Sequence, residues 1–177
     1  VGRVTNCSKS NALNYSMVFW DEIFNQVAQE YPDVTTDTAL VDAITMWFVK
    51  NPEHFDVIVA SNLFGDIITD LGAMLQGGMG FAAGANLNPE KTYPSMFEPI
   101  HGSAPKYTGK GIANPVATIE SVRMMLDHLG ECEAAQAIET AIIQVLSQGE
   151  IKTRDMGGGH TTTQMGDAIT DAVKQNK

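Results

Sequence analysis

The chain has 177 residues, of which 44% are hydrophobic, so it is long enough to bury a core without structural disulfides or metals. Eleven basic residues against twenty-one acidic ones give a formal net charge of −10, which disfavours nucleic acid and anionic membrane surfaces as partners. The two cysteines, Cys7 and Cys132, have no metal-binding or redox spacing, and no secretory signal or long apolar run is recognisable. These features are typical of a cytoplasmic protein made of one domain or two small lobes.

Strands and helices are expected to alternate in the first part of the chain. Apolar and β-branched runs predict strands at 1–7, 34–41 and 55–60, and apolar residues at helical spacing predict helices at 14–30, 42–50 and 64–76. Lys9, Asp42 and Asn62 each stand where a strand leads into a helix, and Asp42 is expected to cap its helix. The alternation favours the α/β class. The chain starts inside a strand pattern, so we expect that an upstream part is missing.

Glycines at 77, 78 and 80 interrupt this alternation, and we place a boundary there between two lobes, 1–76 and 77–177. The second lobe is predicted to begin with two strands, at 81–85 and 95–98. A long loop over 101–115 follows, rich in glycine and proline, and its lack of periodicity favours a functional role. Three amphipathic helices are predicted at 116–129, 133–146 and 163–174.

Asp66 and Asp70 form the first candidate site. They lie on the predicted helix over 64–76, about 40° apart around its axis and roughly opposite its apolar stripe. Like charges at this spacing repel unless a cation lies between them, and carboxylate oxygens suit a hard divalent cation. A solvated helix flank, with early acidic residues favoured by the helix dipole, explains the pair equally well. The pair alone therefore leaves both interpretations open.

Six motifs in a fixed order resemble a known family. They are Cys7–Asn11 (CSKSN), Tyr31–Val34 (YPDV), Val41–Ala43 (VDA), Asn62–Asp70 (NLFGDIITD), Phe97–Pro105 (FEPIHGSAP) and Gly109–Pro115 (GKGIANP). In this order the chain resembles the isocitrate/isopropylmalate dehydrogenase family over essentially its whole length. Its motif sequences are most similar to those of the tartrate dehydrogenase and D-malate dehydrogenase (decarboxylating) branches. The resemblance implies the C-terminal half of an isopropylmalate-dehydrogenase-like fold, a three-layer α/β/α arrangement and not a Rossmann fold.

The resemblance also implies a reaction, the oxidation of a 2-hydroxy acid by a nicotinamide cofactor, usually with β-decarboxylation. Asp42, Asp66 and Asp70 match the family's metal ligands, and all-oxygen ligation suits Mg²⁺ or Mn²⁺. Lys9 matches the family's catalytic lysine, which takes the hydroxyl proton, and Asp42 would act beside it. Outside this context, a lone lysine after a strand is usually solvated, and Asp42 would be only a helix cap.

A homodimer is implied as well, because in the family the lysine and the first aspartate reach into the neighbouring subunit's site. Two predicted helices carry more apolar residues than one thin lobe can cover, and a helix bundle across a two-fold axis would bury them. These residues are Ile44, Trp47, Phe48, Ile67, Ile68, Met74 and Leu75.

The loop over 101–114 matches the family's adenosine-binding loop. Lys106 and Tyr107 replace the acidic residue that NAD-using relatives carry, and a cation with a phenol favours the 2′-phosphate of NADP. Arg154 is a candidate second cation for the 2′-phosphate. In contrast, the sequence of residues 111–114 (GIAN) resembles the corresponding motif of NAD-using relatives. The matching nucleotide-site residues are Glu98, His101, Gly102, Ser103, Ala104, Lys106, Tyr107 and Asn114.

Family enzymes are longer than this chain, and their N-terminal half carries the arginines that clamp the substrate carboxylates. Arg3, Arg123 and Arg154 are the only arginines present, and none stands in that motif. Three explanations remain open: a fragment of a longer enzyme, a chain that receives its other half in trans, or a truncated, inactive dimeric remnant that binds metal or nucleotide. A metal-dependent hydrolase built on the three aspartates is a further alternative. The identity of the hydroxy acid cannot be predicted, because the residues that select it lie in the missing half.

Overall fold

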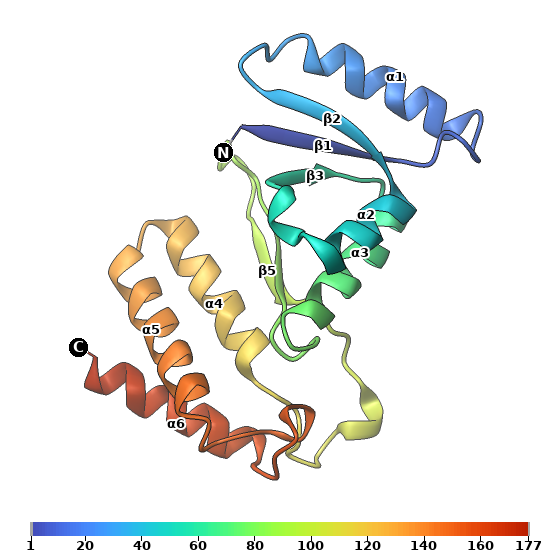
Figure 1. The fold of residues 1–177 in the computed structure, drawn as a ribbon. Coiled ribbons are helices and arrows are strands. Elements are labelled where there is room, and N and C mark those ends of the chain that lie inside the picture. Colours follow the sequence, from blue (N-terminus) through green and yellow to red (C-terminus); the bar gives the residue numbers. More distant parts are fainter. Residues whose placement is uncertain (1, 177) are drawn as a thin grey trace. The chain divides into compact units, whose positions relative to one another are not determined.

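The computed structural model describes residues 2–176 and divides the chain into two compact units, one ending at Leu75 and the other beginning at Gln76. The first unit alternates strands and helices, and the second places a hairpin before a group of helices (Figure 1). No helix among the described residues is long and apolar enough to cross a membrane.

The first unit is built on a three-stranded parallel sheet with the strand order β2-β1-β3. The central strand β1 pairs along its whole length with β2, from Arg3 opposite Thr35 to Ser8 opposite Leu40, and over three residues with β3. The elements of this unit are β1 (Arg3–Ser8), α1 (Ser16–Ala28), β2 (Thr35–Leu40), α2 (Val41–Lys50), η1 (Pro52–His54), β3 (Val57–Val59) and α3 (Asn62–Leu75).

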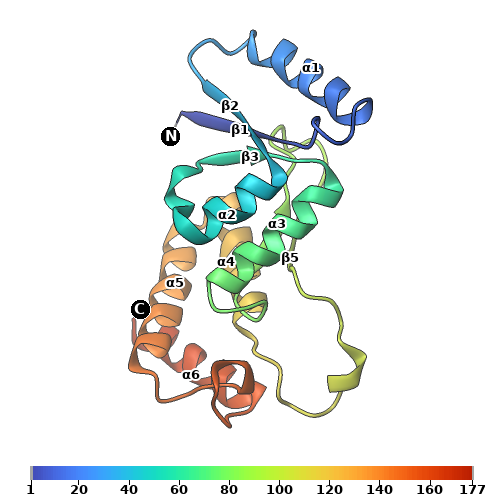
Figure 2. The same ribbon diagram turned by 45° about the vertical axis from the view of Figure 1, so that its right-hand side comes forward.

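Helices cover both faces of this sheet, α1 on one side and α2 with α3 on the other (Figures 1 and 2). The chain moves in opposite directions from β1 to β2 and from β2 to β3, and right-handed crossovers then require helices on opposite faces. The resulting α/β/α layering is the predicted one. The fully buried residues Cys7 and Ile44 lie in one core cluster with Met17, Phe64 and Ile68.

The second unit combines an antiparallel hairpin with three helices. Its core is formed by the helices, and Met165, Ile169 and Ala141 are among its most deeply buried side chains. In Figure 2 the chain between β5 and α4 runs as a long extended connection with one short helical turn. The elements are β4 (Ala83–Asn86), β5 (Met96–Pro99), η2 (Pro105–Tyr107), α4 (Val116–Leu129), α5 (Cys132–Gln148), η3 (Arg154–Met156) and α6 (Thr162–Gln175).

Local sequence signals explain where several of these helices begin and end. Thr161 and Gln164 form a reciprocal capping box at the start of α6, which satisfies two backbone N–H groups there. Gly130 and Gly149 end α4 and α5 in the left-handed conformation, with φ of 89° and 65°.

The predicted helices and strands are confirmed, with ends that differ by a few residues; Val1, in the first predicted strand, lies outside the described residues. The placement of three residues of the first unit is corrected. Asp42 does not cap α2, because the strand β2 runs directly into the helix, Leu40 is the N-cap and Asp42 lies in the first turn. Ile44 and Ile68, expected at a subunit interface, are 0% and 4% exposed within the unit's own core. The apolar faces of α2 and α3 are wide enough that one part of each forms this core. Other apolar residues of these helices, such as Trp47 and Ile67, are exposed.

Candidate active site

Lys9 and Asp42 meet at the carboxyl edge of the sheet. Because β1 and β2 are parallel and in register up to Ser8 and Leu40, the residues that follow them are brought side by side. Lys9 Nζ donates a hydrogen bond of 2.5 Å to Asp42 Oδ1. This hydrogen bond, with a backbone hydrogen bond, lowers the pKa of the Asp42 carboxyl. The Asp42 side chain remains 60% exposed, so it is accessible to a further ligand.

A buried polar network that the sequence did not point to supports the strand end before Lys9. Asp21 on α1 accepts hydrogen bonds from Asn6 Nδ2 at 2.7 Å and from Ser8 Oγ at 2.9 Å, and Trp20 Nε1 donates to Asn6 Oδ1 at 2.6 Å. Burial alone would raise the pKa of Asp21, but the hydrogen bonds from Ser10, Ser8 and Asn6 outweigh it and lower that pKa. Asn6 and Ser8, two polar residues at alternate positions of a buried strand, are the sequence feature from which this network could have been predicted.

Asp66 and Asp70 project from α3 on the face opposite Phe64 and Ile68, which with Ala73 are the buried residues of that helix. Both aspartates are exposed, and neither makes a side-chain hydrogen bond or ion pair with any residue in the range 2–176. Two carboxylates without protein partners on one helix face fit the oxygen-donor chemistry of a hard divalent cation.

The structure does not gather Asp42, Asp66 and Asp70 into one cluster. Over the described range, no group of three or more His, Cys, Asp or Glu side chains lies close enough to hold a metal ion. A cation held by Asp66 and Asp70 would therefore need further ligands from outside this set, such as water, substrate or a second copy of the chain.

The second unit contains a cavity of about 870 Å³ along the loop between β5 and α4. Its size falls within the range of small-molecule and cofactor sites. Seven of the eight predicted nucleotide-site residues line it, and Glu98, which lies on β5, does not. The lining residues are Met79, Gly80, His101, Gly102, Ser103, Ala104, Lys106, Tyr107, Thr108, Ile112, Ala113, Asn114, Arg154 and Asp155.

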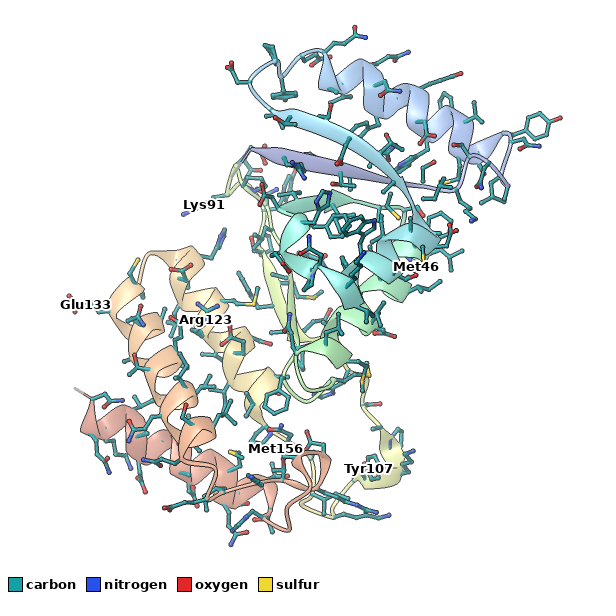
Figure 3. All side chains as sticks on the ribbon, in the orientation of Figure 1. Met46, Lys91, Tyr107, Arg123, Glu133 and Met156 are labelled. Carbon is teal, nitrogen blue, oxygen red and sulfur yellow. The ribbon has the colours of Figure 1, made fainter. Side chains whose placement is uncertain are left out.

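Lys106 and Arg154 are cationic side chains that line this cavity, and two lysines lie near the ring of Tyr107, which lines it as well. Lys106 Nζ lies 4.9 Å from the centre of the Tyr107 ring, and Lys110 Nζ lies 6.0 Å from it. Tyr107, which is labelled in Figure 3, belongs to the short turn η2, and Arg154 lines the cavity from η3. These cations oppose the net charge of −10 and fit a phosphate-bearing cofactor such as a nicotinamide dinucleotide.

The start of α6 anchors the end of this loop, which the sequence did not predict. The Thr162 backbone N–H donates to Gly111 O at 2.8 Å, and Thr162 Oγ1 donates to Ala113 O at 2.6 Å. At Asn114, the side-chain amide donates to Asp155 Oδ2 at 3.0 Å. The loop is therefore held against α6 and η3 by hydrogen bonds from residues about 40 to 50 positions away.

The comparisons with known proteins show which family the chain belongs to. The family model described as isocitrate/isopropylmalate dehydrogenase matches residues 2–169. The chain belongs to this family. A crystal structure of isocitrate dehydrogenase from Methylococcus capsulatus superposes with a TM-score of 0.90 at 44% identity, covering 98% of this chain and 51% of that one.

Curated relatives of this dehydrogenase family carry several substrate names. A probable tartrate dehydrogenase/decarboxylase of Bacillus subtilis (strain 168) is 49% identical over 172 residues, which cover 97% of this chain and 48% of the relative. The D-malate dehydrogenase [decarboxylating] of Escherichia coli (strain K12) is 50% identical, and the 3-isopropylmalate dehydrogenase of Thermobifida fusca (strain YX) is 49% identical. The chain spans about half the length of each of these curated relatives.

Proposed function

We propose that the chain is the C-terminal portion of a metal-dependent NAD(P) oxidoreductase that oxidises a 2-hydroxy dicarboxylic acid with β-decarboxylation. Substrates of the tartrate, D-malate or 3-isopropylmalate type fit the names of the relatives. The observation that carries the proposal is the Lys9–Asp42 pair at the carboxyl edge of the parallel sheet, the place where α/β proteins bind ligands.

In this proposal the four candidate site residues of the first unit divide the chemistry between metal binding and proton transfer. Asp66 and Asp70 would hold Mg²⁺ or Mn²⁺, with Asp42 supplied by a second subunit. The bound cation would polarise the substrate hydroxyl and stabilise the negative charge that decarboxylation leaves. Lys9, as the neutral amine, would accept the hydroxyl proton at Nζ, while the hydrogen on the hydroxyl-bearing carbon passes as hydride to the nicotinamide. Lys9 Nζ donates a hydrogen bond to Asp42, so this role requires Asp42 to turn to another partner.

A homodimer is part of the same proposal. The exposed apolar residues of α2 and α3 support it, since Trp47 is 39%, Ile67 51% and Met74 64% exposed. A contiguous exposed apolar patch marks an interaction site, and a two-fold interface covers the same residues on both copies. An Asp42 shared across this interface accounts for the third ligand that the single chain does not bring to Asp66 and Asp70.

The two cations that line the cavity, Lys106 and Arg154, favour NADP over NAD. A 2′-phosphate would be attracted by Lys106 and Arg154, whereas a carboxylate at position 106 would repel it and could instead bond the ribose hydroxyls of NAD. We expect Lys106→Asp to reverse the preference in a titration of NADP⁺ and NAD⁺. Equal preference in the original chain and the variant would contradict the assignment.

Complementation tests the dehydrogenase activity. The chain is mixed with the separately produced N-terminal half of the Bacillus subtilis relative, with Mn²⁺ and either NAD⁺ or NADP⁺, and nicotinamide reduction is followed by absorbance with each hydroxy acid. We expect no turnover by the chain alone, which lacks an arginine clamp, and turnover after mixing. Lys9→Met should remain inactive in the mixture.

Two other results would replace the proposal. Metal and nucleotide binding without turnover, even after mixing, would favour the inactive dimeric remnant. Hydrolytic product formed without nicotinamide would favour a metal-dependent hydrolase.

A further inference from the structure

Asp155 in η3 connects the nucleotide cavity to a buried turn. Its Oδ2 accepts a hydrogen bond from Asn114 Nδ2 at 3.0 Å, and its Oδ1 accepts one from Thr153 Oγ1 at 2.5 Å. Thr153 is fully buried, and its carbonyl accepts from the N–H groups of Met156 and Gly158. Asp155 is exposed, but both of its carboxylate oxygens accept hydrogen bonds from buried residues, Thr153 and Asn114.

Asn114 is held from two sides. Its side-chain oxygen accepts from the Val116 N–H at 3.0 Å at the start of α4, and one Nδ2 hydrogen is given to Asp155. An asparagine amide has two N–H donors, so one remains for a ligand in the cavity that Asn114 lines. Only 8% of Asn114 is exposed, so water has little access to this second N–H group.

Gly80 shows how closely this pair is packed. A Cβ at position 80 would lie 2.6 Å from Asp155 Oδ2 and 2.9 Å from Asn114 Cβ. The backbone of Gly80 does not have a positive φ, so the absence of a side chain serves space and not conformation. The Asp155–Asn114 hydrogen bond thus lies directly against the backbone of another segment that lines the cavity.

We propose that Asp155 is a positioning residue of the nucleotide site, which fixes the Asn114 amide so that its free N–H serves the bound cofactor. The inference rests on the proposed binding of a dinucleotide in this cavity and adds a role for a residue outside the predicted site.

Electrostatics and positioning predict opposite results when Asp155 is replaced. The carboxylate is a negative charge beside Arg154 and near a ligand that carries phosphates, so removing it should by charge alone tighten binding. Loss of the hydrogen bond to Asn114 should weaken it. Asp155→Asn removes the charge and keeps an acceptor for Asn114, and its NH₂ group can donate to Thr153 Oγ1 in place of the hydrogen bond that Thr153 now donates, whereas Asp155→Ala removes both hydrogen bonds.

The test is calorimetric titration of NADP⁺ and NAD⁺ into the chain and its variants. We expect Asp155→Asn to bind at least as tightly as the original chain, and Asp155→Ala to bind about tenfold more weakly. Asp171→Ala, which removes an exposed carboxylate of α6 paired only with Lys174, controls for net charge and should not weaken binding. Far-UV circular dichroism during heating shows that each variant is folded.

Gly80→Ala provides a second variant without any change in charge. It should weaken binding to a similar degree, because the new methyl group must displace Asp155 or Asn114. Binding by the Asp155→Ala and Gly80→Ala variants as tight as by Asp155→Asn would overturn the positioning role and leave the cofactor site standing. Failure of the original chain to bind either dinucleotide would instead overturn the proposed function.

Discussion

At the scale of single residues, the ion pair at the sheet edge joins Lys9 and Asp42, which are 33 positions apart in the sequence. The sequence placed each of them after a strand, and the parallel register brings them together. It could not show that they bond to each other in the free chain, because this depends on the helix beginning directly after Leu40. The pair is exposed, so its main effect is on protonation and orientation, with little on stability.

Lys9→Met should return the titration of Asp42 toward the usual aspartate range. In the original chain, the hydrogen bond from Lys9 holds the pKa of Asp42 below that range. The stabilisation from a lowered pKa is present above the unfolded-state value of about 4 and is lost as the pH falls through the folded value. Carbonyl-detected NMR of Asp42 during an acid titration measures the shift, and an identical titration in both proteins would contradict it.

The two cysteines should differ in reactivity. Burial raises the pKa of Cys7 to about 11, so its thiol stays neutral at pH 8, whereas Cys132 is exposed at the start of α5. Because the thiolate is the reactive form, a disulfide reagent should modify one thiol in the folded chain and two in denaturant. Cys132→Ser should abolish the fast reaction, and rapid modification of Cys7 in that variant would show that the first core is open.

At the scale of elements, α2 divides its apolar residues between two environments. Ile44 is fully buried, whereas Trp47 is 39% exposed and stacks on His54 with ring centres 5.3 Å apart. Periodicity predicted the helix and its apolar character, but it could not assign residues to the core or to a partner. The same limit applies to Ile68 and Ile67 on α3, of which only the first is buried. Such assignments need the positions of the neighbouring elements.

Ile44→Ala should lower the free energy of unfolding of the first unit by about 2–5 kcal/mol, as expected for a large core residue shortened in a closely packed site. Both tryptophans, Trp20 and Trp47, belong to this unit, so their fluorescence in urea reports its unfolding. Met46→Ala, at a position 66% exposed on the same helix, should change that free energy by less than about 0.5 kcal/mol. Equal changes in the free energy of unfolding for the two variants would mean that Ile44 does not stabilise the core.

At the scale of the whole molecule, the chain corresponds to about half of its curated relatives and still divides into two compact units. The motifs predicted the family, the layered fold and many of the residues that line the cavity of the second unit, because those residues stand in contiguous runs. The roles of Asp155, Thr162 and Asp21 were not predictable in this way. Each depends on contacts across the chain, and none is marked by its neighbours in the sequence.

Trp47→Asp should convert a dimer to a monomer, because a charge would enter the apolar surface of α2 and α3 at the proposed interface. Light scattering after size exclusion gives the mass. Tyr15→Asp, at a position 92% exposed at the start of α1, should leave the dimer intact. A Trp47→Asp protein that is folded and keeps its dimeric mass would contradict the interface; Ile67→Glu repeats the test on α3.

The central position of β1 has a consequence for how the chain folds. This strand pairs with residues 35–40 and 57–59, which are distant from it in the sequence. Because contacts between distant residues form slowly, we expect the first sheet to form late in folding. In the second unit, α4 packs on α5 and α5 on α6, each beside its neighbour in the sequence. We therefore expect the helices near the C-terminus to assemble rapidly from local contacts, although they are synthesised last, while the sheet limits the overall rate.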